Sequence, residues 1–539
     1  MSNPTPHGSG VRGLDLARAS LFFEGAFGRL FRALPPAEFG GSDQDTLDNL
    51  QKLAGAMVGP DDNAKDGADP EESGIPALYT YLGQFVDHDL TFDPASSLQQ
   101  QNDIDGLVDY RTPRFDLDSV YGRGPDDQPY LYRGGPGTPT LLVGTMALKG
   151  GTPADPAVQD LPRSGGTPPR AIIGDPRNDE NVIVSQLHGL FLRFHNRFAA
   201  ENPDLPFGQV QQAVRFYYQW LLIHDFLPTL ISAPVLQKVF PHLASGKSLA
   251  DQPPVLKLYH AKNEAFMPLE FSVAAYRFGH SMVRPGYRLN DNDKTLLPIF
   301  GANDPDIGRP KSLRGFMPPD STWGLDWARF IDIEDRPNGV MLDDDGNVAG
   351  TGKPPTAAQK AELTRRLQLA YRIDTSLVKP LSTLPVDVAD KIIRALALRN
   401  LQRGWRLRLP SGQAVARALG IEPLKRVVIG SFEDGAEVTP DPKKPPFDLN
   451  RAPGFEAFRG NCPLWTYCLA ETFESDVEGK FGVKSKLLGP VGGGIVAETF
   501  AGLLTYDSHS FLNVDPLWKP KIGGGRFGLK ELVRYALGK

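Results

Sequence analysis

Apolar residues recur every three to four positions along several stretches of this 539-residue chain. This spacing is typical of helices that bury one face, and it is clear between residues 181 and 201, where Val182, Leu187 and Leu190 share a face. We expect helices at 80–90, 181–201, 209–230, 269–283, 356–373, 386–403 and 494–504. Patterns typical of strands are few and short, as at 426–429. The pattern therefore predicts a mainly α protein with little β structure.

Stretches rich in proline and glycine lie between the predicted helices. The chain contains 49 prolines and 56 glycines, which concentrate at 58–76, 123–139, 149–170, 301–323, 335–356 and 434–454. Long connections between helices commonly carry function or wrap a shared core, and they seldom join independent domains. We therefore expect a single domain over residues 16–539, preceded by a disordered tail at 1–15.

Composition excludes several classes of protein. The net charge of −6 and the pI near 5.9 argue against binding to nucleic acid or to a membrane surface through positive charge. No stretch approaches the roughly 20 apolar residues that span a bilayer. The first residues lack the basic and apolar regions of a secretory leader, so we expect the cytoplasm of a bacterium or leaderless export. Cys462 and Cys468 match no zinc-binding spacing, and we interpret them as buried reduced thiols.

The clearest chemical signal is the sequence GQFVDHDL at 83–90, where ionisable residues interrupt an apolar helix. Burying Asp87, His88 and Asp89 is costly unless they find partners; the alternative is a helix end whose aspartates face water. Neighbouring residues on a helix point about 100° apart, so His88 and Asp89 can serve two different sites. Gln84 lies four residues before His88 and shares its face.

A group of oxygen-bearing side chains follows in the sequence TPRFDLDSVYG at 112–122. Calcium takes about six to eight oxygen ligands from carboxylates, hydroxyls and backbone carbonyls. Thr112, Asp116 and Asp118 are spaced so that one loop can wrap such an ion, with Asp89 completing the set. The alternative is a turn with solvated aspartates.

The sequence GDPRNDE places Arg177 three residues before Glu180, just ahead of the helix predicted at 181–201. A guanidinium is always charged and presents a rigid fork of donors, which suits it to stabilise a developing negative charge. The alternative is an acidic first turn that complements the helix dipole, a role that Asp179 and Glu180 can fill.

A single histidine, His280, lies in the apolar stretch 271–285 within the sequence RFGHSMV. On such a helix a histidine is commonly a hydrogen-bonded core residue. As a metal ligand it would bind through one ring nitrogen, and the other ring nitrogen would need an acceptor to hold the ring in place.

Taken in order, these segments resemble the motifs of the animal haem peroxidases, a family of the peroxidase–cyclooxygenase superfamily. The resemblance covers roughly residues 30–520 and adds a further motif, RNLQR, at 399–403. It implies a helical core around a buried haem b, with long irregular connections and little β structure. It also implies that His280 is the proximal ligand of the haem iron and that Asn400 accepts from its second ring nitrogen. His88 would be the distal acid and base, with Arg177 and Gln84 beside it.

The same resemblance implies how the cofactors are held. Arg277 and Arg403 correspond to arginines that meet the haem propionates. Asp87 and Glu180 correspond to carboxylates that form ester links, so the haem would be free or linked through one or both. Where mammalian members commonly carry serine, this chain has Asp118 or its neighbour Ser119. The implied calcium ligands are the side chains of Asp89, Thr112, Asp116 and Asp118 and the backbone carbonyl of Arg114.

Two positions separate this chain from particular members of the superfamily. Asn181 stands where a methionine bonds to a haem vinyl group, so we expect no third covalent link. Arg277 stands where the fatty-acid dioxygenases carry a radical-forming tyrosine, and Tyr276 is turned about 100° away on a helix. These residues favour a peroxidase over a dioxygenase. A non-catalytic haem- or calcium-binding scaffold is the third interpretation, disfavoured because His88 and Arg177 are both present.

The implied activity is reduction of hydrogen peroxide and oxidation of halide, thiocyanate or small phenols, in keeping with a response to oxidative stress. His88 would move the proton of the peroxide, and Arg177 would stabilise the developing negative charge. We expect a monomer, because Cys462 and Cys468 offer no obvious interchain disulfide of the kind found in mammalian relatives.

Overall fold

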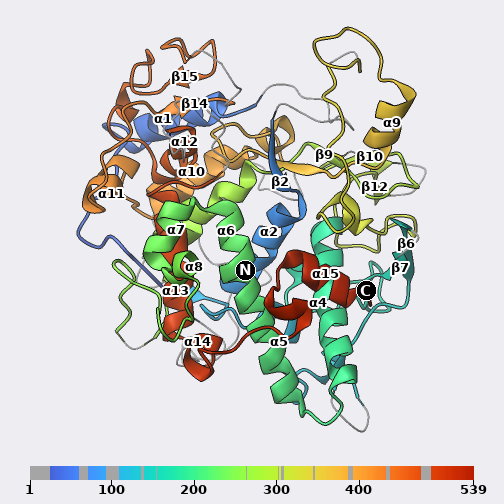
Figure 1. The fold of residues 1–539 in the computed structure, drawn as a ribbon. Helices are drawn as coiled ribbons and strands as arrows, with labels where there is room; N and C mark the ends of the chain where they lie inside the picture. The colour runs from blue at the N-terminus through green and yellow to red at the C-terminus, as the bar shows by residue number, and fades with distance from the viewer. Residues whose placement is uncertain are drawn as a thin grey trace, which may run out of the picture.

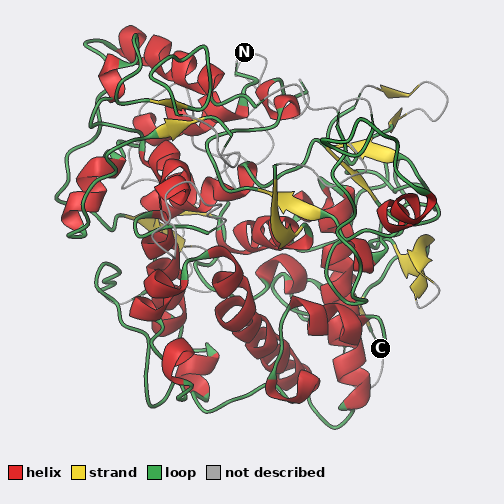
Figure 2. Ribbon diagram, turned by 45° about the horizontal axis from the view of Figure 1, so that its top comes forward, coloured by secondary structure: helices red, strands yellow, loops and turns green. Residues whose placement is uncertain are grey.

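The computed structural model describes residues 25–59, 71–92, 108–134, 139–152, 155–262, 264–301, 303–304, 309–343, 346–385, 393–431, 438–474 and 487–539. The predicted tail at 1–15 lies outside these residues. Helices dominate the described part of the chain, and short strand pairs lie around them (Figure 1). Figure 2 shows how small the strands are beside the helices. The prediction of a mainly α fold is confirmed.

The helix that carries His88 is α2 (Leu78–Leu90), and it packs against α4 (Val182–Glu201). Phe85 of α2 stacks on Phe191 of α4, with ring centroids 4.5 Å apart and both side chains buried. Aromatic pairs of this kind contribute about 0.5–1.5 kcal/mol beyond the burial of their area. This contact anchors α2, and with it the polar residues of GQFVDHDL.

The predicted helix at 209–230 is nearly continuous in the structure. It begins as α5 (Phe207–Leu221), passes through a π-helical turn, η5 (Leu222–Phe226), and ends as α6 (Leu227–Leu230). α5 packs against α4, so α2, α4 and α5 lie side by side in the described core.

The segment around His280 is not the α-helix that we predicted over 269–283. It is a π-helix, η6 (Glu270–Ala274), followed directly by a 3-10 helix, η7 (Ala275–His280). The change occurs at Ala274, whose backbone angles of −127° and −76° are not helical. Apolar periodicity does not distinguish these helix types, and single π turns are frequent at functional sites.

The helix predicted at 356–373 is present only in its first half. α9 (Ala357–Thr364) begins at Thr356, whose side chain caps it. The chain then forms strand β13 (Leu369–Tyr371), which pairs antiparallel with β2 (Glu72–Pro76). The prediction was wrong for 365–373, because a strand pairing formed with a segment about 300 residues away in the sequence is invisible to local periodicity.

Two further helices were predicted in part or whole. The helix predicted at 386–403 is α10 (Leu396–Arg406), and residues 386–392 lie outside the described part of the chain. The helix predicted at 494–504 is α13 (Gly492–Tyr506), which is almost entirely buried. The remaining α-helices are α1 (Asp43–Ala56), α3 (Asp118–Tyr121), α7 (Ala233–Val239), α8 (His242–Ser245), α11 (Gly412–Ala418), α12 (Leu464–Glu474), α14 (Phe511–Val514) and α15 (Leu529–Ala536).

The strands form a small three-stranded sheet and several pairs. The sheet has the order β3-β1-β8, and the strand predicted at 426–429 is the short β14. The other strands are β1 (Gly25–Gly28), β3 (Val108–Asp109), β4 (Tyr132–Arg133), β5 (Thr140–Leu141), β6 (Ala147–Thr152), β7 (Asp155–Gln159), β8 (Met267–Pro268), β9 (Gly286–Arg288), β10 (Leu296–Pro298), β11 (Asn303–Asp304), β12 (Arg309–Pro310), β14 (Val428–Ile429) and β15 (Phe447–Asp448).

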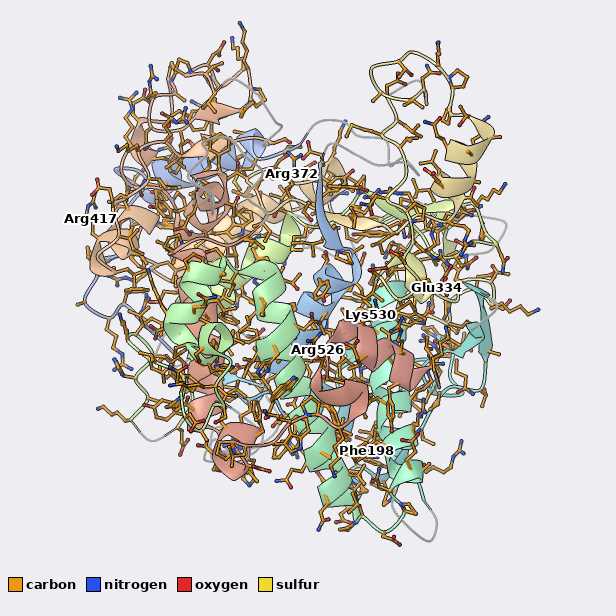
Figure 3. All side chains as sticks on the ribbon, in the orientation of Figure 1. Phe198, Glu334, Arg372, Arg417, Arg526 and Lys530 are labelled. Atoms are coloured by element: carbon orange, nitrogen blue, oxygen red, sulfur yellow. The ribbon has the colours of Figure 1, made fainter. Side chains whose placement is uncertain are left out.

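One large cluster of buried apolar residues extends along the chain from Phe31 to Ala536. Side chains fill the spaces between the ribbons of this core (Figure 3). Cys462 and Cys468 are buried free thiols, as predicted. Within the described residues, every helix is too short or too polar to cross a membrane.

Candidate active site

His88 lies near the end of α2 and is buried, with 5% of its surface exposed. Its Nδ1 is 2.8 Å from Oδ1 of Asn178. An amide oxygen only accepts hydrogen bonds, so Nδ1 carries the proton and Nε2 keeps its lone pair. Nε2 lies 3.5 Å from Oε1 of Glu180, and the same oxygen accepts a hydrogen bond from Gln84. The structure thus brings Gln84, His88 and Glu180 together, with Nε2 of His88 placed to act as a base.

Behind His88 lies a pair that sequence reasoning missed, Asn178 and His188. Nδ2 of Asn178 donates to Nδ1 of His188 at 3.0 Å, and both residues are fully buried. Burial lowers the pKa of His188 to about 3, so its ring is neutral and can accept this hydrogen bond. With both ends of its amide engaged, Asn178 holds the ring of His88 in one orientation. The only hint in the sequence is the position of Asn178 inside GDPRNDE.

Arg177 and Asn178 both belong to the short 3-10 helix η4 (Pro176–Asp179), which packs against α2. Arg177 donates from Nε and Nη2 to Asp175, with a shortest distance of 2.7 Å, and from Nη2 to the carbonyl of His88 at 3.0 Å. Burial opposes ionisation of Asp175, but Arg177 and Arg111 hold its pKa well below the usual range. The predicted distal arginine is therefore fixed against the helix that carries the predicted distal histidine.

His280, at the end of η7, is half-buried and its ring is neutral. Burial, followed by the nearby charge of Arg277, lowers its pKa to about 3. Nδ2 of Asn400 on α10 lies 2.8 Å from Nδ1 of His280, so the two side chains meet as the resemblance implied, but with the amide nitrogen of Asn400 toward the ring. When the amide oxygen of Asn400 faces the ring, Nδ1 carries the proton and Nε2 keeps its lone pair, which is the form that binds a metal. Arg403 follows Asn400 by three residues on the same helix.

Arg277 joins the segment of His280 to the helix of His88. Its Nη1 lies 3.4 Å from Oδ2 of Asp87, and its Nε donates to the carbonyl of Ser272 at 2.8 Å. Burial opposes ionisation of Asp87, yet Arg277 lowers its pKa, so the pair is ionic. The structure therefore places one residue predicted for a propionate against one residue predicted for an ester link, where α2 and η7 pack together.

The predicted calcium ligands meet in a compact acidic cluster, which we define as Asp89, Asp116 and Asp118. One carboxylate oxygen of each lies within 4.8 Å of the others. Burial, together with the neighbouring carboxylates, raises the pKa of Asp89 well above its usual range. Oδ1 of Asp118 is buried and has no hydrogen-bond partner among the described residues. Such a set of hard oxygen donors fits calcium.

The other two predicted calcium ligands lie beside the acidic cluster. Thr112 donates from Oγ1 to Oδ2 of Asp116 at 2.8 Å. The backbone N–H of Arg114 donates to the carbonyl of Thr112 at 2.8 Å, and its Nε lies 3.8 Å from Asp507. The role of the Arg114 carbonyl remains a prediction. α5 holds this loop through Gln219, which donates to the carbonyl of Phe115 at 2.9 Å.

The helical core carries these side chains in the order of the motifs seen in the sequence. Residues 100–301 match the model of a family described as animal haem peroxidase. Thyroid peroxidase from Sus scrofa is 28% identical over 234 residues, which cover 39% of this chain and 23% of that protein. Eosinophil peroxidase from Homo sapiens is 26% identical over 139 residues, covering 24% of this chain and 18% of that protein.

Among solved structures, peroxidase A from Dictyostelium discoideum has a similar fold, with a TM-score of 0.53 and 16% sequence identity. The alignment covers 93% of this chain and 92% of that one. The family match, the thyroid peroxidase relatives and this shared fold confirm the resemblance to the animal haem peroxidases that was seen in the motifs. Its match spans about a quarter of the length of the thyroid peroxidase.

Proposed function

We propose that the chain is a haem peroxidase that reduces hydrogen peroxide and oxidises small electron donors. The observation that carries this proposal is the hydrogen bond from Nδ1 of His88 to Asn178 at 2.8 Å. It leaves Nε2 as a base beside the short helix η4, which also presents Arg177. The match to the animal haem peroxidase family supports the same function.

The donor set fits haem b. His280 is neutral and its Nδ1 lies against the amide of Asn400; with the amide oxygen turned to the ring, Nδ1 would donate to it and Nε2 would be free to bind iron. Arg277 and Arg403 are the cations proposed to meet the anionic propionates. When bound, the haem would supply the iron at which the O–O bond is broken and electrons are exchanged. Asp87 pairs with Arg277, and Glu180 accepts a hydrogen bond from Gln84. An ester at either carboxylate would replace that contact.

The protein's own groups then account for the movement of the proton. Nε2 of His88 takes the proton from one oxygen of hydrogen peroxide and returns it to the other oxygen, which leaves as water. Arg177 uses Nε and Nη2 to hold Asp175 and the carbonyl of His88, so Nη1 remains to donate to the developing negative charge. Gln84, on the same face of α2, would orient the peroxide.

We propose that calcium occupies the acidic cluster. The ion would join Asp89, on α2 next to His88, to Asp116 and Asp118 on the following loop. Thr112 and the carbonyl of Arg114 would complete the coordination. The ion would thereby fix the end of the helix that carries the base.

Two other functions are less well supported. A fatty-acid dioxygenase would need a tyrosine in place of Arg277, which shares a face with His280 because a 3-10 helix has three residues per turn. The nearby Tyr276 instead donates to the carbonyl of Gly83 at 3.3 Å. A non-catalytic scaffold would not need Asn178 and Arg177 to be placed beside the base, His88.

The proposed donors are halide, thiocyanate and small phenols, and the proposed state is a monomer in a single domain. Steady-state oxidation of each donor at fixed peroxide ranks the donors. Size-exclusion chromatography with light scattering measures the subunit number, and a stable dimer would contradict the monomer.

The direct test is the absorption spectrum of the purified chain after reconstitution with hemin. We expect a ferric Soret band that shifts with hydrogen peroxide and returns when iodide or a phenol is added. His88→Ala should keep the band and lower the rate of the peroxide reaction by about 10²–10⁴-fold. His280→Ala should alter or abolish the band, whereas Asn202→Ala, at the far end of α4, should change neither.

Each contrary result has a distinct meaning. Failure to bind hemin would overturn the assignment of the cofactor. A haem band that does not change with hydrogen peroxide would favour the non-catalytic scaffold. Oxygen uptake with a fatty acid would favour the dioxygenase.

A further inference from the structure

Arg111 lies between the acidic cluster and the distal arginine, Arg177. It contacts one carboxylate of the cluster and the carboxylate that holds Arg177. Its Nη1 is 3.3 Å from Oδ2 of Asp118, and its Nη2 is 2.6 Å from Oδ2 of Asp175. Asp175 is also the carboxylate that holds Arg177, at 2.7 Å. A continuous chain of opposite charges therefore runs from Asp118 through Arg111 and Asp175 to Arg177. Charge-assisted hydrogen bonds of this kind are among the stronger polar contacts in proteins.

The backbone holds the two ends of this chain against each other. The N–H of Asp175 donates to the carbonyl of Ser119 at 3.0 Å, and Nη2 of Arg111 donates to the carbonyl of Gly174 at 3.3 Å. A Cβ at position 174 would lie 2.5 Å from the carbonyl oxygen of Ser119. Only glycine allows the loop of Arg177 to approach the loop of the acidic cluster this closely.

The acidic cluster and Asp175 compete for the positive charge of Arg111. Asp89, Asp116 and Asp118 carry three carboxylates at one point, and Arg111 is a cation in contact with one of them. Without a bound cation, Arg111 is shared between Asp118 of the cluster and Asp175. A divalent cation would neutralise the cluster and free Arg111 to pair more fully with Asp175. Asp175 would then hold Arg177 less tightly.

We propose that Arg111 is a positioning residue that couples occupancy of the acidic cluster by a divalent cation to the orientation of Arg177. The inference rests on the proposed function, because the effect on Arg177 is measured through the binding of an anion to the haem iron. Arg111 acts through Asp175 and touches neither peroxide nor haem. A bound cation increases the freedom of Arg177 to donate to an anion in the distal pocket.

The test measures the affinity of the hemin-reconstituted ferric protein for cyanide, with calcium and with a chelator. In the wild type, calcium should strengthen cyanide binding by about fivefold or more, the usual size of a coupling between sites. Arg111→Gln and Asp175→Asn should reduce this ratio to near one. Arg336→Gln removes another buried guanidinium, one that pairs with Asp291 and Asp326, and should keep the wild-type ratio.

A second measurement separates the charge of Arg111 from its bridging geometry. Calcium affinity is measured by calorimetry on the chain without hemin. Arg111→Gln removes a positive charge beside the cluster and should raise the affinity severalfold. Arg111→Lys keeps the charge but loses the planar fork that spans two carboxylates. It should keep the wild-type calcium affinity and still lose the effect of calcium on cyanide binding.

The two proposals fail in different ways. Absence of a haem band overturns the proposed function. A normal haem band with the same cyanide affinity in calcium and in chelator overturns the coupling alone. The coupling is also overturned if calcium no longer strengthens cyanide binding in Arg336→Gln, or if Arg111→Gln lowers calcium affinity.

Discussion

Nδ1 of His88 donates a hydrogen bond to the side-chain oxygen of Asn178, 2.8 Å away, and Asn178 in turn donates to His188. This pair of bonds leaves Nε2 as the nitrogen of His88 that can act as a base. We expect Asn178→Ala to lower the rate of the peroxide reaction by roughly 10- to 100-fold, because the ring loses its orienting partner. Stopped-flow absorbance at the Soret band measures this rate.

The acidic variant at the same position makes a sharper test. Asn178→Asp keeps an acceptor for Nδ1 but adds a negative charge, which favours protonated His88. The loss of activity at low pH should therefore begin at a higher pH than in the wild type. Asn202→Ala serves as the matched control, since Asn202 bonds the carbonyl of Phe198 far along α4. An unchanged pH profile in Asn178→Asp would count against the role of Asn178.

Asn400 should control the electron density on the imidazole of His280, and through it the midpoint potential of the haem iron. An amide oxygen turned to Nδ1 at this 2.8 Å contact would polarise the ring, and a carboxylate there would polarise it more. We expect Asn400→Asp to lower the ferric–ferrous midpoint potential and Asn400→Leu to raise it, as measured by spectroelectrochemistry. Gln402→Ala, on another face of α10, should leave the potential unchanged. Equal potentials in all three variants would show that Asn400 only fills space.

Calcium should stabilise the fold through the acidic cluster. At about 100 times its dissociation constant, a ligand adds about 2.7 kcal/mol to the free energy of unfolding. We expect calcium to raise the melting temperature of the wild type and to have little effect on Asp116→Asn. Asp127→Asn removes an exposed carboxylate whose side chain is 58% exposed, and it should respond to calcium like the wild type. Differential scanning fluorimetry in calcium and in chelator makes the comparison.

Buried histidines should make the protein less stable in acid. His195 is fully buried; Tyr121 lies 3.0 Å from its Nδ1, and the carbonyl of Pro139 lies 3.3 Å from its Nε2. Burial lowers its pKa to about 4, against about 6.5 in an unfolded chain. Between these values the unfolded chain binds a proton that the folded chain does not. Stability therefore falls as the pH falls through this window, by up to about 1.4 kcal/mol per pH unit.

Urea unfolding at pH 7.5, 6.0 and 5.0 measures this dependence. His195→Gln should be less stable than the wild type at pH 7.5, because buried hydrogen bonds are lost. Its stability should nevertheless fall less steeply with acid. His260→Gln replaces an exposed histidine and should keep the wild-type slope. A slope in His195→Gln as steep as that of the wild type would contradict the prediction.

Local spacing was enough to predict several features of this site. Gln84 and His88 are four residues apart, so any helix places them on one face, and the structure shows both reaching Glu180. The oxygen donors of the loop after α2 are spaced to surround one point, and the structure brings Asp116 and Asp118 to Asp89. The contact of Asn400 with His280 was implied by family motifs, since 120 residues separate the two.

Other features depend on contacts between distant segments, which local patterns do not record. The strand β13 pairs with β2 although its sequence continues the apolar rhythm of α9, because the partner strand offers hydrogen bonds that a longer helix would forgo. The π and 3-10 helices before His280 likewise cannot be told from an α-helix by the spacing of apolar residues.

By itself the sequence determined the helical class, which follows from the spacing of apolar residues, and it predicted the candidate site residues through motifs that resemble those of a known family. Tertiary structure alone decided that Asn178 orients His88 and that Arg111 lies between Asp118 and Asp175. The physical reason is that a hydrogen bond acts over about 3 Å and depends on direction, so the partner of a polar side chain is set by the packing of whole elements.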